Sequence, residues 1–562
     1  MKTTGYLHLL LLSIGILFFK SGSAQSSWLM AKGFANGHDN EVYGGARDTA
    51  GNIFEVGFLQ YDMDFDTVHV VTAGSASGFI VKMDTACNVL WADGMRNNSS
   101  VFIYGICTDQ AGNAYVAGSF SGSGFIFGND TLNSSGFTDM FVAKYDPAGN
   151  ELWARKAGGN STDQGYAITA DPSGNVYVTG IFQSNVAQFG NLSLNNSGGY
   201  DVYLAKYDAN GNEVWIRKSG GTRYDWATGV AADEVGDVYL GGYFNSRKFI
   251  CGNDTIVSPD TAFYEAFIAK YDTAGNCNRI TGIPGPSDVL ALALMADPSG
   301  NAVYTTGYFY GSAFSIGTYS FTGSGGEEAL LLKMDSSLSL VWAKAAGGTA
   351  NAVGRAVALN KNGDLCWSGG FGTVTPGTVV IGSDTFSMPA SSSDPAFISL
   401  WKPDGTNLCT DDLRTGGDDV VALIPDKFSS ALYFASDASL TSPMVVASDT
   451  LQGLGEFPFI AKWLCPDELI GIPSLSSTHE LFTCYPVPAE EELHVRLNAG
   501  EPQQGRIILR NILGETVFIY EFGNSEVELA IPVNDLPPGI YFCALERSGV
   551  QVASEEVAVI HD

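Results

Sequence analysis

Residues 171–180 read DPSGNVYVTG, and this pattern of an acidic residue, a Gly-Asn pair and an aromatic-containing apolar run returns along most of the chain. Its copies are spaced 61, 62, 62, 64, 63 and 66 residues apart. A second pattern, typified by FIAKYD at residues 267–272, recurs in step with the first. Two patterns with one period indicate a repeat architecture with one supersecondary unit per period. The copies begin at Asp48, Asp109, Asp171, Asp233, Asp297 and Asn360, with Gly-Asp in place of Gly-Asn in the fourth and sixth, and a worn seventh copy that lacks the Gly-Asn turn begins at Asp426.

Each unit is expected to fold as a four-stranded antiparallel sheet. In the third copy the apolar runs cover residues 165–171, 176–182, 202–208 and 213–218. The Gly-Asn pairs between runs supply the positive φ angles that short hairpins need. An additional strand-like arm, residues 188–194, lies between the second and third runs. Seven such units predict an all-β fold built around a seven-bladed β-propeller.

The two ends of the repeat region complement each other. A fourth strand follows six of the seven third strands, and the missing copy lies upstream. There, residues 28–32 (WLMAK) match residues 153–156 (WARK). We therefore expect the N-terminal strand to pair with residues 459–464 and close the ring, because closure removes two unpaired sheet edges.

Charge and composition disfavour several functions. The chain of 562 residues has 29 Lys+Arg against 60 Asp+Glu, a formal charge of −31, which disfavours nucleic acid as a partner. Hydrophobic residues make up 45% and charged residues 16%, as expected for a folded protein. Histidine is scarce, and no GxSxG, GxGxxG, P-loop or HExxH motif occurs. The sequence therefore offers no recognised catalytic motif.

Residues 1–24 are expected to form a signal peptide. Lys2 precedes an apolar run over residues 7–19, and the small residue Ala24 offers a cleavage site before Gln25. A non-cleaved anchor is the alternative, although the run is short for crossing a bilayer. No later stretch is long and apolar enough for a membrane helix, so the mature chain is expected to lack a transmembrane segment.

The nine cysteines are scattered and form no CxxC motif, so a zinc or redox site is not expected. Cys251 and Cys277 are a candidate disulfide because both lie in the fourth unit, and export would permit such a bond. The alternative is that the cysteines serve as small buried hydrophobic residues.

The repeat resembles the SBBP-type β-propeller repeat. The residues that carry the likeness are Gly158-Gly159, Asp163 and the run from Asp171 to Gly180. The likeness covers roughly residues 28–465 and is strongest in the second to fourth units. It implies a propeller, which we assign to residues 25–466, and it implies no activity.

After the repeats, residues 467–484 are predicted to be a linker and residues 485–562 a small β-sandwich. This tail resembles the type A C-terminal sorting domain of the type IX secretion system of Bacteroidetes-like bacteria. Two departures are Val487, where the family usually has Asn, and Glu555-Glu556, where it usually ends in a basic strand. The motif residues are Tyr485, Pro486, Pro488, Gly514, Gly539 and Tyr541.

The resemblance implies that the type IX secretion machinery is a partner and that the protein is secreted or held at the outer cell surface. It further implies passage through the outer membrane, then removal of the tail and release or attachment to surface lipopolysaccharide. An ordinary sandwich domain with a ligand of its own is the alternative.

Polar residues at near-equivalent positions precede the first strand of most units. In a propeller they would gather around one mouth of the central channel, where they could bind Ca²⁺ or sugar hydroxyls. The alternative is that each side chain caps backbone N–H groups at a turn. Tryptophans recur in the fourth strand, at Trp91, Trp153, Trp215 and Trp342, and are predicted to pack between blades. The polar ring comprises Asn40, Asp163, Asp225, Asp288, Asn351 and Asp418.

These observations favour a secreted or cell-surface binding or adhesion module without catalytic activity. Carbohydrate or a surface protein is the expected ligand, and Ca²⁺ is the candidate cofactor. One alternative is a hydrolase or lyase that acts on polysaccharide with carboxylates at the channel mouth. A structural surface-layer component is the other.

Overall fold

The computed structural model describes residues 27–34, 40–96, 99–259, 261–323, 325–372, 377–388, 395–413, 422–440, 444–446, 449–451, 455–465, 482–485, 492–497, 505–511, 516–522, 528–534, 536–537, 539–547 and 550–559. Within these residues the secondary structure is all strand, and no helix long and apolar enough to cross a membrane is found. The predicted signal peptide, residues 1–24, lies outside the described residues, as does most of the predicted linker.

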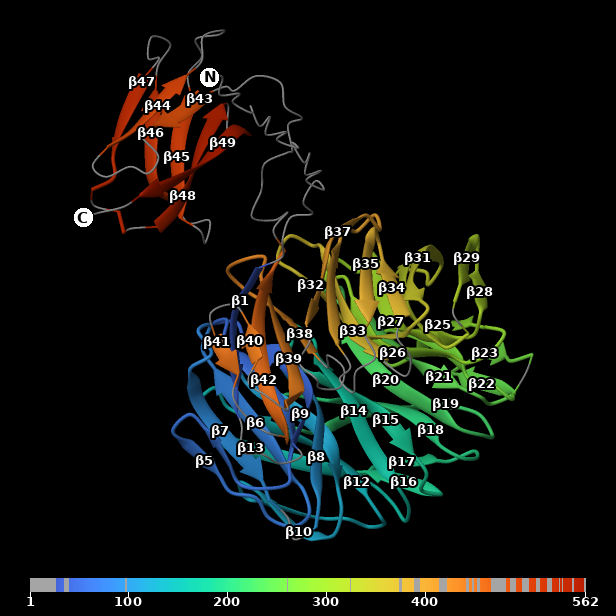
Figure 1. The fold of residues 1–562 in the computed structure, drawn as a ribbon. Helices are drawn as coiled ribbons and strands as arrows, with labels where there is room; N and C mark the ends of the chain where they lie inside the picture. The colour runs from blue at the N-terminus through green and yellow to red at the C-terminus, as the bar shows by residue number, and fades with distance from the viewer. Residues whose placement is uncertain are drawn as a thin grey trace, which may run out of the picture.

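The described strands of the repeat region form seven four-stranded antiparallel sets, each a propeller blade (Figure 1). The middle strands are buried along nearly their whole length because a neighbouring blade covers each of their faces. In order from the channel outward, the blades are β2 (Asn40–Arg47), β3 (Ile53–Leu59), β6 (Ser77–Met83), β7 (Val89–Met95); β8 (Val101–Thr108), β9 (Ala114–Phe120), β12 (Asp139–Tyr145), β13 (Glu151–Gly158); β14 (Asp163–Ala170), β15 (Val176–Phe182), β18 (Asp201–Tyr207), β19 (Glu213–Gly220); β20 (Asp225–Ala232), β21 (Val238–Phe244), β24 (Glu265–Tyr271), β25 (Cys277–Ile283); β26 (Val289–Ala296), β27 (Ala302–Tyr310), β30 (Glu327–Asp335), β31 (Leu340–Gly348); β32 (Asn351–Leu359), β33 (Leu365–Gly372), β36 (Ala396–Trp401), β37 (Asn407–Leu413); and β38 (Ala422–Pro425), β39 (Leu432–Leu440), β42 (Gly455–Leu464), β1 (Ser27–Gly33).

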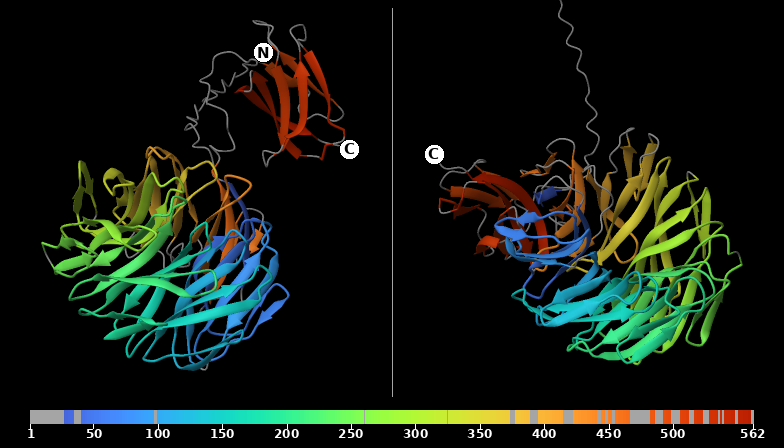
Figure 2. Two further views of the ribbon diagram at one scale, coloured as in Figure 1. Left: turned by 180° about the vertical axis from the view of Figure 1, so that it is seen from behind. Right: turned by 90° about the horizontal axis from the view of Figure 1, so that it is seen from below.

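The N-terminal strand closes the ring, as the sequence predicts. Strand β1 pairs antiparallel with β42, with Lys32 opposite Ile460 and Ser27 opposite Leu464. The innermost strands contact one another in chain order, and β38 of the last blade also contacts β2 of the first. Figure 2 shows the blades following one another in order of colour, with the orange strands of the last blade beside the blue strands of the first. The seven blades therefore share one central channel.

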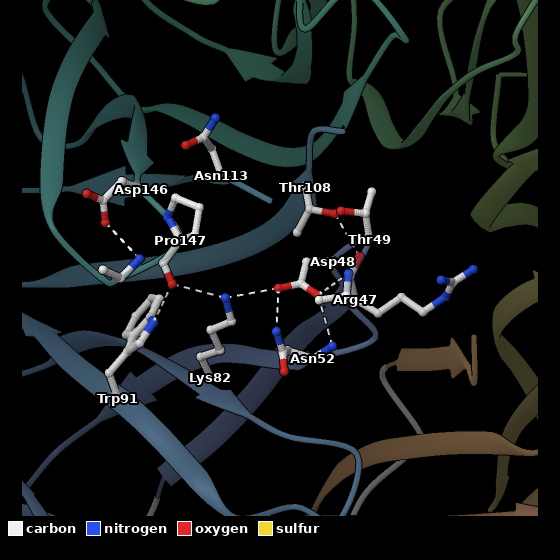
Figure 3. A network of polar contacts seen from close by, with 12 residues as sticks. Arg47, Asp48, Thr49, Asn52, Lys82, Trp91, Thr108, Asn113, Asp146 and Pro147 are labelled. Atoms are coloured by element: carbon white, nitrogen blue, oxygen red, sulfur yellow. Dashed lines mark hydrogen bonds and ion pairs between the residues drawn. The ribbon is translucent and has the colours of Figure 1, made fainter. Parts of the chain in front are cut away.

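One polar network joins residues of both repeat patterns and accounts for their recurrence along the chain (Figure 3). The Asp48 carboxylate accepts hydrogen bonds from the backbone and side chain of Asn52, which shapes the first hairpin turn. Lys82, from the FIAKYD-like strand, lies 2.9 Å from the same carboxylate and donates to the carbonyl of Pro147 in the next blade. Trp91 donates to that same carbonyl at 3.2 Å. The repeat thus specifies both the turn and the contact between neighbouring blades.

The fourth-strand tryptophans pack between blades, which confirms the prediction. The indole nitrogens of Trp153, Trp215 and Trp342 each donate to a carbonyl in the third hairpin turn of the following blade. A glycine of that turn lies against the indole: a Cβ at Gly211, where φ is +80°, would come within 2.8 Å of Trp153. A positive φ and a close approach together require glycine at this position.

The arms between second and third strands are two-stranded hairpins, and three of them depart from the expected arrangement. β16, β22 and β34 pair with the outer strand of the preceding blade, not with their own blade. An outer strand leaves a row of unpaired backbone groups, and the arm of the next blade satisfies part of it. The arm strands are β4 (Met63–Phe65), β5 (Val68–Val70), β10 (Ser123–Phe127), β11 (Asp130–Asn133), β16 (Val186–Phe189), β17 (Leu192–Asn195), β22 (Lys248–Cys251), β23 (Asp254–Val257), β28 (Ala313–Ile316), β29 (Tyr319–Thr322), β34 (Gly377–Ile381), β35 (Asp384–Met388), β40 (Met444–Val446) and β41 (Asp449–Leu451).

Two disulfides join parts of the propeller. Cys251 in an arm bonds Cys277 in the outer strand of the fourth blade, as the candidate pairing predicts. Cys409 in the sixth blade bonds Cys465, which follows β42 in the seventh blade. The second bond therefore holds the blade that carries the ring closure to its neighbour, and the sequence did not indicate it.

The C-terminal domain contains two antiparallel sheets that share one core. The first orders β43 (Phe482–Tyr485), β44 (Glu492–Leu497) and β47 (Glu528–Pro532). The second orders β46 (Thr516–Phe522), β45 (Gly505–Asn511), β48 (Gly539–Arg547) and β49 (Val550–Val559). Buried side chains of both sheets, such as Val495 and Leu509, meet in a single apolar cluster. β43 begins within the segment predicted to be the linker.

Candidate binding channel

Six of the innermost strands contain a β-bulge at the same place in the repeat. The register with the second strand shifts by one residue there, so one residue on the inner strand is left without a partner. A bulge changes the direction of the side chain that it carries, and bulges are common beside functional sites. The bulge residues, in blade order, are Tyr43, Tyr104, Tyr166, Thr228, Leu292 and Arg355.

All six bulge residues line a central cavity of about 580 Å³. The same cavity is lined by residues of all seven innermost strands, including Ala422 and Leu423 of the last blade, so it lies in the propeller channel. Aliphatic side chains line the channel further along the inner strands: Ile106, Ile168, Val230, Leu294, Val357 and Leu423. The volume is that of an ordinary small-ligand pocket.

Aromatic rings form a continuous arc on one side of the cavity. The ring centroids of Tyr43 and Tyr104 lie 5.1 Å apart, and those of Tyr104 and Tyr166 lie 5.4 Å apart. These three side chains are partly exposed. The arc thus lines the channel with aromatic side chains, and the hydroxyl of Tyr166 donates to Gln164 outside the cavity lining.

In the fourth blade Trp226 extends this aromatic surface toward the channel mouth. It is the second residue of β20 and lies opposite Tyr243 in the register, with the two rings 5.5 Å apart and 24° from parallel. Tyr200, Tyr224 and Tyr264 also contact the indole, at centroid distances of 5.0, 5.9 and 5.8 Å. Tyr224 is 44% exposed, so the cluster reaches the molecular surface.

The cavity has an uneven charge distribution. The structure describes all of its lining residues. They include one charged side chain, that of Arg355, and no Asp or Glu. Burial raises the pKa of Tyr104 and raises that of Tyr243 to about 12, so these hydroxyls stay protonated at neutral pH. The cavity therefore combines hydrogen-bonding hydroxyls, aromatic faces and one guanidinium.

The predicted polar ring lies near this channel, but its described members do not line the cavity. Asp163 is 1% exposed, and its carboxylate accepts hydrogen bonds from Gly159 N at 2.8 Å and from the Ser184 hydroxyl at 2.5 Å. Asp225 is fully buried and accepts from Gly221 N at 2.7 Å and the Ser246 hydroxyl at 2.8 Å. These contacts agree with the alternative interpretation, in which each side chain caps backbone N–H groups at a turn.

The remaining ring residues show related contacts. Asn40 is fully buried and its side-chain oxygen accepts from Gln60 N, and the Asp288 carboxylate accepts from Tyr264 N. Asn351 starts β32 and is half-buried, whereas Asp418 lies outside the described residues. No group of three or more metal-ligating side chains occurs in the described part of the chain. Ligand binding by the ring stays a prediction.

Burial also perturbs the ring carboxylates. It raises the pKa of Asp225 to about 6, opposed by the hydrogen bonds from Ser246 and Gly221 and assisted by the nearby Asp201. Burial raises the pKa of Asp163 as well, with a smaller contribution from Asp139. In each case the second carboxylate belongs to the third strand of the preceding blade, so the pair spans two blades.

Sequence reasoning missed the bulge residues. The signal was present, because Tyr43, Tyr104, Tyr166, Thr228, Leu292 and Arg355 are spaced 61, 62, 62, 64 and 63 residues apart, in step with the repeat. Their identities vary while their position is constant. A repeat position whose residue type changes from unit to unit is not needed for the fold that the units share. Such variation would have indicated a candidate ligand-binding surface.

The sorting-domain motif is described only in part. Tyr541 is buried, and its hydroxyl donates to the carbonyl of Pro537 at 2.6 Å. Tyr485 ends β43 and Gly539 starts β48. Pro486, Pro488 and Gly514 lie outside the described residues.

Two family models match the chain. Residues 483–559 match a secretion system C-terminal sorting domain, and residues 152–180 match a β-propeller repeat of the SBBP type. The first match covers the two-sheet C-terminal domain, and the second lies in the second and third blades.

The chain is also similar to longer curated proteins. A regulatory protein, FlaEY, of Caulobacter vibrioides is 26% identical over 289 residues, which is 47% of this chain and 29% of that protein. A WD repeat-containing protein of Acanthamoeba polyphaga mimivirus is 30% identical over 153 residues, 25% of this chain and 11% of that protein. The chain thus spans less than a third of the length of either relative.

Among solved structures, a protein from Lactobacillus plantarum matches with a TM-score of 0.35 and 11% identity, over 73% of this chain and 98% of that one. Sqt1 from Chaetomium thermophilum matches with a TM-score of 0.32 and 11% identity, over 72% and 97% of the two chains. We draw no functional conclusion from matches at this level. The family matches show that the chain carries an SBBP-type β-propeller repeat and a type IX C-terminal sorting domain, and the sorting domain indicates export to the cell surface or secretion.

Proposed function

We propose that the exported propeller is a non-catalytic binding protein that takes the end of a carbohydrate chain into its central cavity. The observation that carries this proposal is the ring of bulge residues, which directs one side chain from each of six blades into one cavity of about 580 Å³. Pockets of this volume suit small ligands or the end of a longer one.

The chemistry of the lining supports a sugar ligand. Sugar rings have apolar C–H faces and polar edges, so they suit a site in which aromatic faces lie beside hydroxyl groups. Tyr43, Tyr104 and Tyr166 supply aromatic faces and phenol oxygens. Thr228 adds a hydroxyl oxygen that can accept a hydrogen bond, because its own proton is donated to the carbonyl of Ala291. Trp226, nearer the mouth, offers a surface for the next sugar along the chain.

The same lining favours binding over hydrolysis. Most glycoside hydrolases place a pair of carboxylates on either side of the bond that is cleaved. The cavity-lining residues, which are all described, include no carboxylate. Asp163 and Asp225 are buried in hydrogen bonds to the backbone and to serines, which does not suit a proton donor or nucleophile facing a substrate.

The test is to screen the purified full-length chain on an array of surface and capsular glycans and then measure affinities by calorimetry. Tyr104→Ala should weaken binding about 10-fold or more, a typical loss for a buried aromatic contact. Phe137→Ala is the matched control, because this aromatic side chain is 76% exposed and lies outside the cavity. Equal affinities of the two variants would contradict the proposal.

The predicted polar ring requires a separate measurement. If Asp163 and Asp225 hold Ca²⁺ that the ligand needs, chelation should abolish glycan binding, and Asp163→Asn should do the same. Unchanged binding in both experiments would remove the ring from the proposal and leave the cavity in it.

We also infer that the tail is removed during export and that the remaining chain is released or attached to surface lipopolysaccharide. The matched sorting domain supports this inference. Mass spectrometry of the natively exported protein tests it, because cleavage near residue 485 removes a defined mass. A full-length exported chain would contradict it.

A further inference from the structure

We propose that the sugar bound in the cavity is acidic: Arg355 binds a carboxylate on the sugar while the tyrosine arc contacts the face of its ring. This inference rests on the proposed function and adds the chemical class of the ligand. It follows from how the bulge residues are distributed around the channel.

Among the bulge residues, the tyrosines and the arginine lie on opposite sides of the channel. Tyr104 and Tyr166 belong to the second and third blades, and Arg355 belongs to the sixth. In a closed ring of seven blades, the sixth is three blades away from the third in one direction and from the second in the other. All three residues occupy the bulge position, so they lie at the same depth. A ligand in the cavity therefore has aromatic rings on one side and a guanidinium on the other.

The charge of the cavity differs from that of the protein. The chain has a formal charge of −31, yet the cavity lining contains Arg355 and no carboxylate. A planar guanidinium can donate two parallel hydrogen bonds to one carboxylate, which gives direction as well as affinity. A single cation at the bulge position of an otherwise uncharged lining indicates a ligand with one anionic group at that place.

Arg355 and two acidic residues of the fifth blade act on the same tyrosine, Tyr308. Tyr308 in β27 experiences the positive charge of Arg355 together with the negative charges of Glu327 and Asp288. Both acidic residues belong to the mouth side of the fifth blade, and neither lines the cavity. The acidic charge near Tyr308 therefore lies outside the cavity, whereas Arg355 lies on its wall.

The rest of the lining favours a sugar acid over other anions with a flat apolar part. The Tyr166 hydroxyl donates to Gln164 and the Thr228 hydroxyl donates to the carbonyl of Ala291, so both oxygens can still accept hydrogen bonds from the several hydroxyl groups that a polyhydroxylated ring offers. A nucleotide would instead need partners for the donors and acceptors of its base and for a highly charged phosphate chain. One guanidinium suits a single carboxylate better than it suits several phosphates.

The experiment compares matched ligands on the full-length protein by calorimetry. The first is a short oligomer of galacturonic acid, and the second is the same oligomer after reduction of its carboxyl groups to primary alcohols. We expect the acidic oligomer to bind about 10- to 100-fold more tightly, the usual effect of a hydrogen-bonded charge. In Arg355→Met this preference should disappear, and in Arg355→Lys it should fall partway because the two-pronged geometry is lost. Arg279→Met, on the outer strand of the fourth blade, is the control and should bind as wild type does.

The outcomes distinguish a failure of the acidic-sugar inference from a failure of the proposed carbohydrate site. If the reduced oligomer binds wild type as tightly as the acidic one, the acidic-sugar inference is wrong and the carbohydrate site stands. If a sulfated oligomer binds more tightly than the galacturonate, the carboxylate assignment is wrong. If adenosine monophosphate binds more tightly than any sugar and Tyr104→Ala weakens that binding, the cavity is a ligand site but the proposed carbohydrate function is wrong. Thermal unfolding of each variant confirms that it is folded.

Discussion

Glu55 is a buried acid whose replacement should stabilise the propeller. It lies in β3, is fully buried, and neither of its carboxylate oxygens has a hydrogen-bond partner among the described residues. The register places Glu55 opposite Gly45, whereas Val116 and Val178 occupy the same place in the second and third blades. We predict that Glu55→Val restores the apolar contact of those blades and removes the cost of burying the acid.

The size of the effect follows from the pKa. Burial raises the pKa of Glu55 from 4.5 to about 8, so the folded protein keeps this proton over a range in which the unfolded chain has lost it. The free energy of unfolding therefore falls as pH rises from 4.5 to about 8, by about 1.4 kcal/mol per pH unit. The loss amounts to about 3 kcal/mol at pH 7 and about 5 kcal/mol above pH 8, and it is absent below pH 4.5.

The assay is urea unfolding of the full-length chain followed by tryptophan fluorescence at pH 5, 6, 7 and 8. All nine tryptophans precede residue 466, so the signal reports on the propeller alone. Relative to wild type, Glu55→Val should gain more at pH 8 than at pH 5, and Glu55→Gln should flatten the pH dependence with a smaller gain. Glu234→Gln, at an exposed position, is the control. An equal effect of Glu55→Val at pH 5 and pH 8 would refute the reasoning.

Three further predictions concern the ring and its contacts. Deletion of β1, residues 27–33, leaves β42 without its outer partner, so we expect a lower Tm and rapid proteolysis within the seventh blade, detected by mass spectrometry. The double variant Cys409→Ser/Cys465→Ser should lose about 2–4 kcal/mol in the same urea assay, whereas reduction of that variant should cost only the contribution of the remaining disulfide. Burial raises the pKa of Asp225 to about 6, so this residue lowers the free energy of unfolding as pH rises from 3.8 to 6. Asp225→Asn should remove this part of the pH dependence of unfolding. An unchanged pH dependence would count against the burial effect.

Much of the fold could be read from local pattern. The Gly-Asn or Gly-Asp turns and the alternation within strands depend on residues close together in the chain, and they recur in most units at a spacing of 61 to 66 residues. The missing fourth strand and the WLMAK segment then required ring closure, which the pairing of β1 with β42 confirms. The tail was recognised from short motifs, and the family match over residues 483–559 agrees.

The site could not be read in the same way. Alternation with a period of two predicts which face a strand residue takes only while the register is unbroken, and a bulge shifts that phase by one. Tyr166 and Arg355 face the channel because of such a shift, which depends on pairing with the second strand. Asp163 looked like a channel residue from its position, but its carboxylate accepts hydrogen bonds from Gly159 N nearby and from Ser184, which lies 21 residues later.

The sequence by itself determined the repeat, the closure of the ring and the export domain. The repeat and the export domain follow from short motifs, and the closure follows from one strand that is missing from the last unit and present upstream of the first. Only the tertiary structure decided which side chains share the channel, how the arms join neighbouring blades and that Cys409 meets Cys465. Those outcomes depend on contacts between blades, which bring together residues far apart in the chain, such as Cys409 and Cys465 at a separation of 56 residues. The repeat predicted the contacts between blades that every unit shares, such as those of the tryptophans, but not the contacts of residues whose identity differs from unit to unit.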